Sequence, residues 1–577
     1  MKGKRDIIKR RIEAAQGQIP ADLVIKNCHI VNVYTQTITE GDIAVIDGYI
    51  AAVGGSYEGR AVWDGKGAYA APGLIESHIH IESSYVSPEE FGRLLVPLGT
   101  TTAIADPHEI VNVCGLDGLS YMMEAAKQTA MDIRYMVPSC VPATDFDHSG
   151  AVLHAPELQA PLRSPDTFGL GELMNYPGVL AADDDIIAKI TAAQEAHKII
   201  DGHSGAVLHG DGLQAYIGSG IATDHECADI EDIRERIAAG MYVMLRNGSA
   251  CHDLPRLIQA VTPASLRRFL LCSDDLHPHT IMAKGHLNEH LRLCVQHGIS
   301  AAAAITMATL NPAECYQLTD RGALAPGKRA DIVLFQDLQD FKAQAVWIAG
   351  TLAGKDGTYR LPFTRSDYSR VSSTVHLRDF SQEKLRMHLK STHVHTIDIL
   401  PGSVVTKKGT ADIQLDAQGD FVYNPQEDIV KVAVVERHHG TGHVGLGLLR
   451  GYGLQQGAIA VSIAHDSHNI ITAGTNTADM AAAVTELERQ KGGMVLVLNG
   501  RVLASIPLPI AGLMSDQSGA WVDTQMASLY HIARHTMGIY EDVDVIMTLC
   551  FMSLPVIPAI KLMDTGLFDV ESFSFIS

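Results

Sequence analysis

Aromatic residues and cysteines are scarce in this sequence of 577 residues, which has 6% aromatics and nine cysteines. No two cysteines form a CxxC pair, a usage typical of reduced cysteines and not of a disulfide framework. No run of 18 apolar residues occurs, so we expect no membrane span. The basic N-terminus, MKGKRDIIKRRIEAAQ, lacks the apolar segment of a secretory signal. We therefore expect a cytoplasmic protein.

Positive charge is also in short supply. The chain has 45 Lys and Arg against 66 Asp and Glu, a formal net charge of −21. An acidic surface argues against nucleic acid or an anionic membrane as the main partner, but it leaves room for a small basic substrate. The chain is too long for one core, so two or three domains are expected. For an enzyme of this size we expect a homo-oligomer, a dimer or higher.

Apolar strands alternate with helix-length segments after Ala71, the pattern of repeated βα units in an α/β protein. The number of candidate strands is that of a (β/α)₈ TIM-like barrel. In chain order these strands are GLIESHIHI, TTAIADP, DIRYMVPSC, TFGLGEL, IIDGHS, IATDHE, MYVMLRNG and FLLCSDD.

The regions on either side of this predicted barrel, residues 72–316, differ from it in pattern. Residues 1–71 alternate in the manner of short strands broken by Asn, Asp and Gly, and residues 317–375 return to that pattern. We expect these two pieces to form one small β-sandwich domain. A polar stretch follows, and residues 380–577 have their own strands and a helix, which predicts a C-terminal α/β domain.

Ionisable side chains stand where the predicted barrel strands end, which is where barrels place their active sites. The first strand contributes His78 and His80, which point the same way because residues two apart share one face of a strand. Four later strands each end in one further candidate ligand. These are Glu172, His203, His225 and Asp274.

Four histidines and two carboxylates at one mouth suit two divalent metal ions. This mixture favours Zn, Mn or Fe over Ca, and Glu172 is placed to bridge two ions. Many barrel hydrolases use a carboxylated lysine on the fourth strand instead, but residues 164–188 contain no lysine. An isolated HxH pair is weak evidence for a metal site, so the prediction depends on five strand ends that agree in order.

The order HxH, acid, His, His, Asp resembles that of the amidohydrolase superfamily. Longer stretches are similar to the bacterial adenine deaminase family, including PGLIESHIHIESS, TTAIADPHEIVNVCG and GLLRGYGLQQGAIAVSIAHDSHNI. The resemblance implies hydrolytic deamination of adenine to hypoxanthine and ammonia in purine salvage. It also implies a metal-activated hydroxide on a binuclear centre of Mn or Fe.

Other polar side chains near the predicted mouth are candidates for moving protons. Asp274 is placed to take a proton from the attacking water and pass it to the leaving amine. Glu109 and Glu226 are both candidates for protonating a ring nitrogen, and the sequence does not rank them. His108 is a candidate for holding the substrate or the water. Alternatively, His108 and Glu109 form a hydrogen-bonded pair at a helix start after Pro107.

The end of the seventh strand supplies three candidate substrate-binding residues, Arg246, Asn247 and Ser249. Arg246 would hydrogen-bond the base or neutralise an acid, and a structural ion pair is an equal alternative. The family usually has Glu where Asn247 stands, which leaves another amino-purine open as the substrate. It also usually has Asp where Glu76 stands, a change that still suits an acid behind the metal ligands.

Two other classes of function remain open. One is a hydrolase of the same fold that acts on a cyclic amide or another aminated heterocycle, and the missing lysine opposes the amide version. The other is a non-catalytic, amidohydrolase-like assembly protein, which the retention of all six candidate ligands opposes. Two His-rich segments, ERHHGTGH and AHDSHNI, suggest either a separate metal site or a loop that covers the barrel mouth or supports a dimer interface. The loop is the better supported interpretation.

Overall fold

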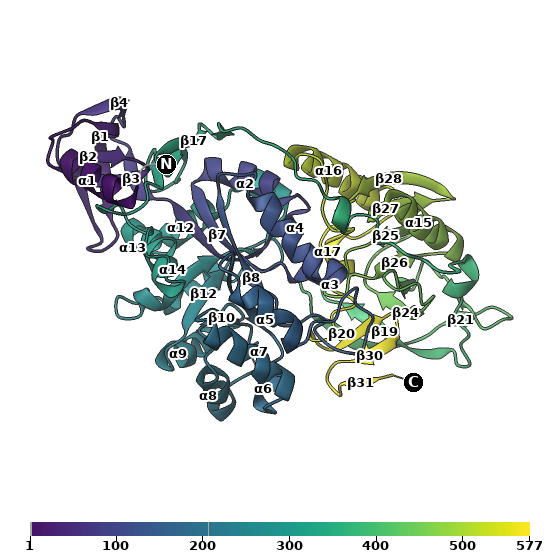
Figure 1. The fold of residues 1–577 in the computed structure, drawn as a ribbon. Helices are drawn as coiled ribbons and strands as arrows, with labels where there is room; N and C mark the ends of the chain where they lie inside the picture. Colours follow the sequence, from purple (N-terminus) through teal and green to yellow (C-terminus); the bar gives the residue numbers. More distant parts are fainter. Residues whose placement is uncertain (1–2, 206, 577) are drawn as a thin grey trace.

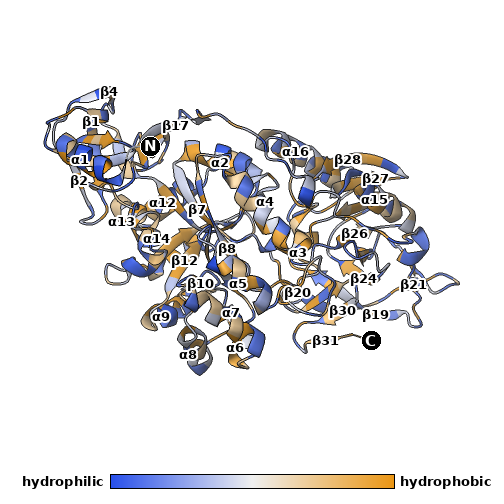
Figure 2. Cartoon of the chain, viewed as in Figure 1, coloured by the Kyte–Doolittle hydropathy of each residue, from blue (hydrophilic) through white to orange (hydrophobic). Residues whose placement is uncertain are grey.

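The computed structural model describes residues 3–205 and 207–576. The chain is elongated, with the N-terminal strands at one end, a set of parallel strands ringed by helices in the middle, and a second large sheet at the other end (Figure 1). Apolar residues concentrate in the strands of the middle and C-terminal parts, whereas the outer helices are mixed (Figure 2). No helix within the described ranges is long and apolar enough to cross a membrane.

The middle of the molecule is a TIM-like barrel. Its strands are β6 (Leu74–His80), β7 (Thr100–Ala105), β8 (Asp132–Val137), β9 (Thr167–Leu173), β10 (Ile199–Gly202), β11 (Thr223–Asp224), β12 (Tyr242–Arg246), β13 (Phe269–Cys272) and β14 (Asp274–Asp275). They pair in parallel in two groups, β10-β9-β8-β7-β6-β14 and β11-β12-β13, and β14 returns to β6 with Asp274 opposite Ile79. Each of the eight predicted strands is present in the predicted order. Every residue of β6 is buried, as expected for a strand covered on both faces.

Helices on the outside of the barrel begin at well-defined caps. The Asp183 carboxylate accepts from the N–H groups of Asp185 and Ile186, and Asp229 forms a capping box with Asp232. The main helices are α2 (Pro88–Leu95), α3 (His108–Cys114), α4 (Leu116–Ala126), α5 (Ala155–Arg163), α7 (Asp184–Glu195), α8 (Gly210–Gly218), α9 (Ile230–Ala238), α12 (Leu287–Gln296) and α13 (Ala301–Met307).

A nine-stranded sheet combines segments from before and after the barrel. β15 pairs antiparallel with β5, so that Val333 lies opposite Ala71. The N-terminal strands are β1 (Ala21–Asn32), β2 (Thr37–Ile46), β3 (Tyr49–Val53), β4 (Gly59–Asp64) and β5 (Tyr69–Pro72). The later strands are β15 (Ile332–Phe335), β16 (Ala343–Ile348), β17 (Thr351–Lys355) and β18 (Thr358–Tyr359). Helix α1 (Lys4–Ala15) packs its Ala14 against this sheet.

An eight-stranded sheet forms the C-terminal part. Its strands are β19 (His393–Ile399), β20 (Thr406–Asp412), β23 (Ile429–Val435), β24 (Val444–Arg450), β25 (Ala458–Val461), β26 (Ile470–Gly474), β27 (Gly493–Leu498) and β28 (Arg501–Pro507). Helix α15 (Thr477–Gln490) packs Val484 and Leu487 onto it, and α16 (Gly519–His535) and the hairpin of β29 (Ile560–Met563) and β30 (Gly566–Asp569) follow. The connection between β25 and β26, residues 462–469, reaches into the barrel mouth.

Candidate metal centre

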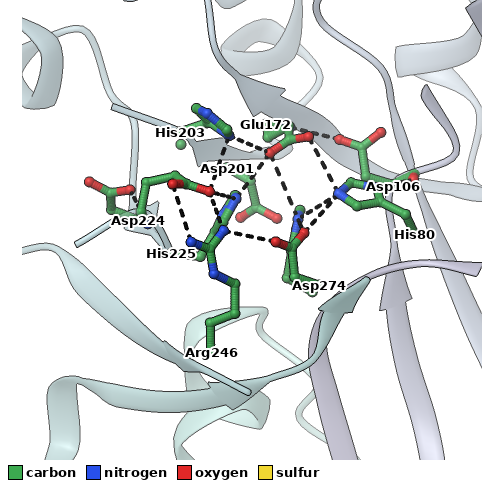
Figure 3. A network of polar contacts seen from close by, with 12 residues as sticks. His80, Asp106, Glu172, Asp201, His203, Asp224, His225, Arg246 and Asp274 are labelled. Atoms are coloured by element: carbon green, nitrogen blue, oxygen red, sulfur yellow. Dashed lines mark hydrogen bonds and ion pairs between the residues drawn. The ribbon is translucent and has the colours of Figure 1, made fainter. Parts of the chain in front are cut away.

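Three of the predicted ligands, His78, His80 and Asp274, meet at the C-terminal end of the barrel (Figure 3 labels two of them). The Nε2 atoms of His78 and His80 face each other at 3.2 Å. The Asp274 Oδ1 atom lies 3.1 Å from His80 Nε2 and 3.6 Å from His78 Nε2. Asp274 has a φ of 63°, unusual for a residue other than glycine and most common at functional sites.

The Glu172 carboxylate lies between these residues and the other two histidines (Figure 3). Its Oε2 atom is 2.9 Å from His203 Nδ1 and 3.1 Å from His225 Nε2. Its Oε1 atom is 3.5 Å from His80 Nε2 and 3.2 Å from His108 Nδ1. All six predicted ligands are thus gathered at one mouth, with Glu172 in the middle.

The chemistry of this cluster fits divalent cations. Burial opposes ionisation of Glu172, but hydrogen bonds from His108 and His203 hold its pKa well below the usual range, so the carboxylate is available as a ligand. The His80 Nδ1 atom lies 2.9 Å from the carbonyl of Asp106, a partner that takes an Nδ1 proton and leaves the Nε2 lone pair toward the cluster. The Nε2 atoms of His78 and His80 point at each other and are surrounded by carboxylates. A cation that both nitrogens and the carboxylates bind would satisfy this arrangement.

Arg246 ties together three acids at the base of the cluster. Its Nη1 atom donates to Asp274 Oδ2 at 2.8 Å and also to Glu226 Oε1, and its Nη2 atom donates to Asp253 at 3.2 Å. Burial acts to raise the pKa of Glu226, but the charges of Arg246, His203 and His225 together outweigh it, and the pKa is lowered. Arg246 therefore forms ion pairs with all three acids, and the Glu226 carboxylate is one of its partners.

Behind the first strand, Glu76 joins β6 to the end of β13. Its carboxylate accepts from Ser273 N at 3.0 Å, from Ser273 Oγ at 2.8 Å and from His78 N at 3.1 Å, and it lies 2.8 Å from His286 Nε2. The backbone of His78 is thereby fixed. His286 could not be predicted from the sequence, because it stands next to a helix start and not at a strand end. Asp106 was also missed, although it ends a strand, and its carboxylate accepts from Glu172 N at 2.8 Å.

Part of the C-terminal region completes the mouth. The connection of residues 462–469 places His465 and His468 against Glu109, and all three side chains are buried. A small cavity of about 10 Å³ lies beside them. The barrel lines it with Glu82, Ser83, Tyr85, Glu109 and His277, and the C-terminal region lines it with Ile463, His465, His468, Leu513 and Met547.

The other predicted substrate-binding residues lie apart from this cavity. Asn247 borders a different cavity, together with Lys284 and His286. The Ser249 hydroxyl accepts from His277 N at 2.9 Å and shares a hydrogen bond of 2.8 Å with Thr280. Neither side chain lines the space next to Glu109.

A TIM-like barrel with imidazoles and carboxylates at its strand ends defines a hydrolase of the amidohydrolase class. The model of the amidohydrolase family matches residues 69–353, and that of the adenine deaminase C-terminal domain matches residues 403–574. "Adenine deaminase 2" of Desulfotalea psychrophila is 53% identical over 99% of both chains. "Adenine deaminase" of Ligilactobacillus salivarius is 49% identical over 100% of this chain and 99% of that one. The chain belongs to the adenine deaminase family, which confirms the resemblance found in the sequence.

Solved structures are similar to this chain at lower identity. Enamidase, a member of the amidohydrolase superfamily, is 18% identical with a TM-score of 0.44, over 60% of this chain and 98% of that one. An adenosine deaminase from Xanthomonas campestris with bound zinc is 17% identical with a TM-score of 0.44, over 59% and 94%.

Proposed function

We propose that this enzyme hydrolyses adenine to hypoxanthine and ammonia, a reaction of purine salvage. The observation that carries the proposal is the convergence of six candidate metal ligands, four histidines and two carboxylates, at one mouth of the barrel. Similarity over nearly the full length to proteins named adenine deaminase supports the same substrate.

Two divalent ions fit the arrangement, with Mn or Fe as the first candidates and Zn as the alternative. His78, His80 and Asp274 would hold one ion, His203 and His225 the other, and Glu172 would bridge the two. Bound there, divalent ions would lower the pKa of water enough to supply hydroxide near neutral pH.

Two groups are needed to transfer protons in this reaction. As hydroxide adds to C6 of the purine, a ring nitrogen gains a proton, and the leaving amine takes another to depart as ammonia. Asp274 suits the second transfer because it faces the ligand cluster while Arg246 fixes its other oxygen. Glu109 suits the first as a relay, because it borders the cavity and contacts His465, whose pKa the Glu109 charge raises to about 9 despite burial. A proton would pass from His465 through Glu109 to the ring nitrogen, and the proton that the new C6 hydroxyl later releases would return by the same path. Glu226, in contrast, is engaged by Arg246.

The cavity beside Glu109 has the mixture of surfaces that a purine requires. Ile463, Leu513 and Met547 offer apolar contact to the faces of a flat ring, and Glu109 and His277 offer polar groups to its edge. As the side chains stand, the cavity holds little more than a water molecule, so the ring enters only when some of them swing outward.

Further parts of the proposal concern the chain as a whole. We assign residues 72–316 to the catalytic barrel, residues 1–71 with 317–375 to a β-sandwich, and residues 380–577 to the C-terminal domain. The nine cysteines are all free, which supports a reducing compartment such as the cytoplasm. A homo-oligomer without nucleic acid or membrane partners fits the acidic charge.

The test is a panel of amino-purines and amino-pyrimidines offered to the purified protein after loading with Mn or Fe. Ammonia release and the ultraviolet change from adenine to hypoxanthine are measured together. Because Asn247 lies away from the cavity, adenine is expected to react fastest despite the departure at that position. Absence of ammonia from every compound would overturn the deaminase proposal.

A further inference from the structure

The two oxygens of the Glu109 carboxylate are each in contact with an imidazole from the C-terminal part of the chain. His465 Nδ1 lies 2.6 Å from Oε1, and His468 Nε2 hydrogen-bonds Oε2. Each oxygen of Glu109 thus has an imidazole nitrogen within hydrogen-bonding reach.

The C-terminal segment itself fixes the orientation of both imidazoles. The Nδ1 atom of His468 accepts a hydrogen bond from Ala464 N at 3.2 Å, which leaves its proton on Nε2, the atom that faces Glu109. The His465 ring stacks on Phe551 with centroids 4.5 Å apart, and its backbone N–H donates to Cys550 O at 2.9 Å. Residues outside the barrel thus set His468 as a hydrogen-bond donor and hold the ring of His465 in place.

The imidazole of His108 lies between Glu109 and the candidate metal ligands. The Oε1 atom of Glu109 is 3.5 Å from His108 Nε2, and the Nδ1 atom of the same ring is 3.2 Å from Glu172 Oε1. On its other side Glu109 borders the cavity between the barrel and the C-terminal region. The carboxylate therefore stands between the place proposed for the purine and the residues proposed to hold metal.

We propose that His465 and His468 are positioning residues that hold the Glu109 carboxylate toward the purine ring, so that the barrel alone lacks a working site. This inference rests on the proposed function, in which Glu109 relays a proton to a ring nitrogen. A free glutamate side chain rotates about several bonds, and an acid displaced by about 1 Å can lose roughly 10²-fold in rate. Two hydrogen bonds formed on folding remove that freedom before the substrate binds.

The test compares amide substitutions that keep or lose the donor atom. His465→Ala and His468→Ala are expected to lower kcat about 10²-fold with a much smaller change in KM. Asn places its amide nitrogen near the position of Nδ1, and Gln places it near Nε2. His465→Asn and His468→Gln are therefore expected to regain about tenfold of the lost kcat, whereas the exchanged pair, His465→Gln and His468→Asn, is not.

All variants are studied as the full-length, metal-loaded enzyme, with metal content and thermal unfolding measured alongside. His535→Asn, at the exposed end of α16, is the control expected to keep the wild-type kcat. Matched and exchanged amides carry the same functional group and differ by one methylene, so a difference in kcat between variants of similar thermal stability reports on the place of the donor atom. The inference is overturned if the alanine variants keep the wild-type kcat, or if matched amides are no better than exchanged ones.

The two proposals fail in different ways. If the wild-type protein releases no ammonia from any compound, the proposed function is wrong. If the wild type deaminates adenine and the histidine variants do so equally fast, only the positioning role is wrong.

Discussion

At the scale of single residues, the candidate metal centre depends on side chains that hold one another in charged form. Glu172 lies within 3.5 Å of four imidazoles, and Asp274 meets two imidazoles and the Arg246 guanidinium. Each of these acids is buried and would be costly to ionise alone. Removing one member therefore affects both metal binding and the charge balance of the rest.

Substitutions at the candidate metal ligands test this dependence. His80→Ala and Asp274→Ala are expected to abolish adenine turnover and to lower the bound metal, measured by elemental analysis, from two ions per chain. His279→Ala is the matched control, since this histidine side chain is 75% exposed near the mouth. Full activity in either ligand variant would refute the assignment.

Arg246 is expected to contribute to stability as well. Its replacement by Met leaves Glu226 and Asp274 without their cation in a buried setting, so the free energy of unfolding should fall by about 3 kcal/mol. Arg256→Met is the control, because Arg256 pairs with Asp253 at the surface and should contribute less than about 1 kcal/mol. Urea unfolding of the metal-free proteins measures both, and equal losses would contradict the prediction.

The site residues that could be predicted from the sequence are those whose position follows from the geometry of their own strand. His78 and His80 could be assigned because strand geometry and the barrel rule place them at one mouth. His465 and His468 could not, because their partner Glu109 is more than 350 positions earlier in the chain. Nor could the sequence choose between a base contact and an ion pair for Arg246, since that depends on how three acids fold around it.

At the scale of elements, burial on both faces explains why the strands could be predicted. The barrel strands are short apolar runs that end in polar residues, and each one was recognisable for that reason. The end of the eighth strand was harder, because it breaks into β13 and β14 at Ser273, where Glu76 binds the backbone. That break turns Asp274 toward the candidate metal ligands His78 and His80.

Strand β29 carries a lysine that predicts a pH dependence. Lys561 is fully buried, and its Nζ donates to the carbonyls of Val404 and Phe551, both at 2.9 Å. Burial lowers its pKa from 10.5 to about 7. Between pH 7 and 10.5 the unfolded chain binds a proton that the folded chain does not, so stability from this group rises with pH.

Lys561→Met should remove this dependence. The difference in urea midpoint between variant and wild type is expected to favour the variant most near pH 7 and to shrink as the pH rises toward 10. A difference that stays constant over this range would show that Lys561 keeps its ordinary pKa in the folded protein.

At the scale of the whole molecule, the C-terminal region is attached to the barrel by polar contacts around the mouth. Asp564 accepts from His148 N at 3.1 Å and lies 2.6 Å from His148 Nδ1, and Asn469 Nδ2 donates to His148 O at 2.8 Å. The Glu90 carboxylate accepts from Gly519 N at 2.9 Å. The barrel and C-terminal region therefore work as one unit around the cavity.

Asp564→Ala should loosen the barrel loop that carries His148. Hydrogen exchange in that loop is expected to become faster while the barrel strands keep their protection. Asp412→Ala is the control, because Asp412 forms an exposed pair with His393 far from the mouth. Unchanged exchange around His148 would mean that other contacts hold the loop.

The pairing of β15 with β5 also has a consequence for how the chain is made. Strand β5 leaves the ribosome well before its partner, since the whole barrel is synthesised between Pro72 and Ile332. During that interval the edge of the N-terminal sheet is open to pairing with other chains. Fast folding of the barrel shortens this exposure by bringing the two halves of the sheet together. Mutations that slow barrel folding should therefore first cause aggregation of the newly synthesised protein.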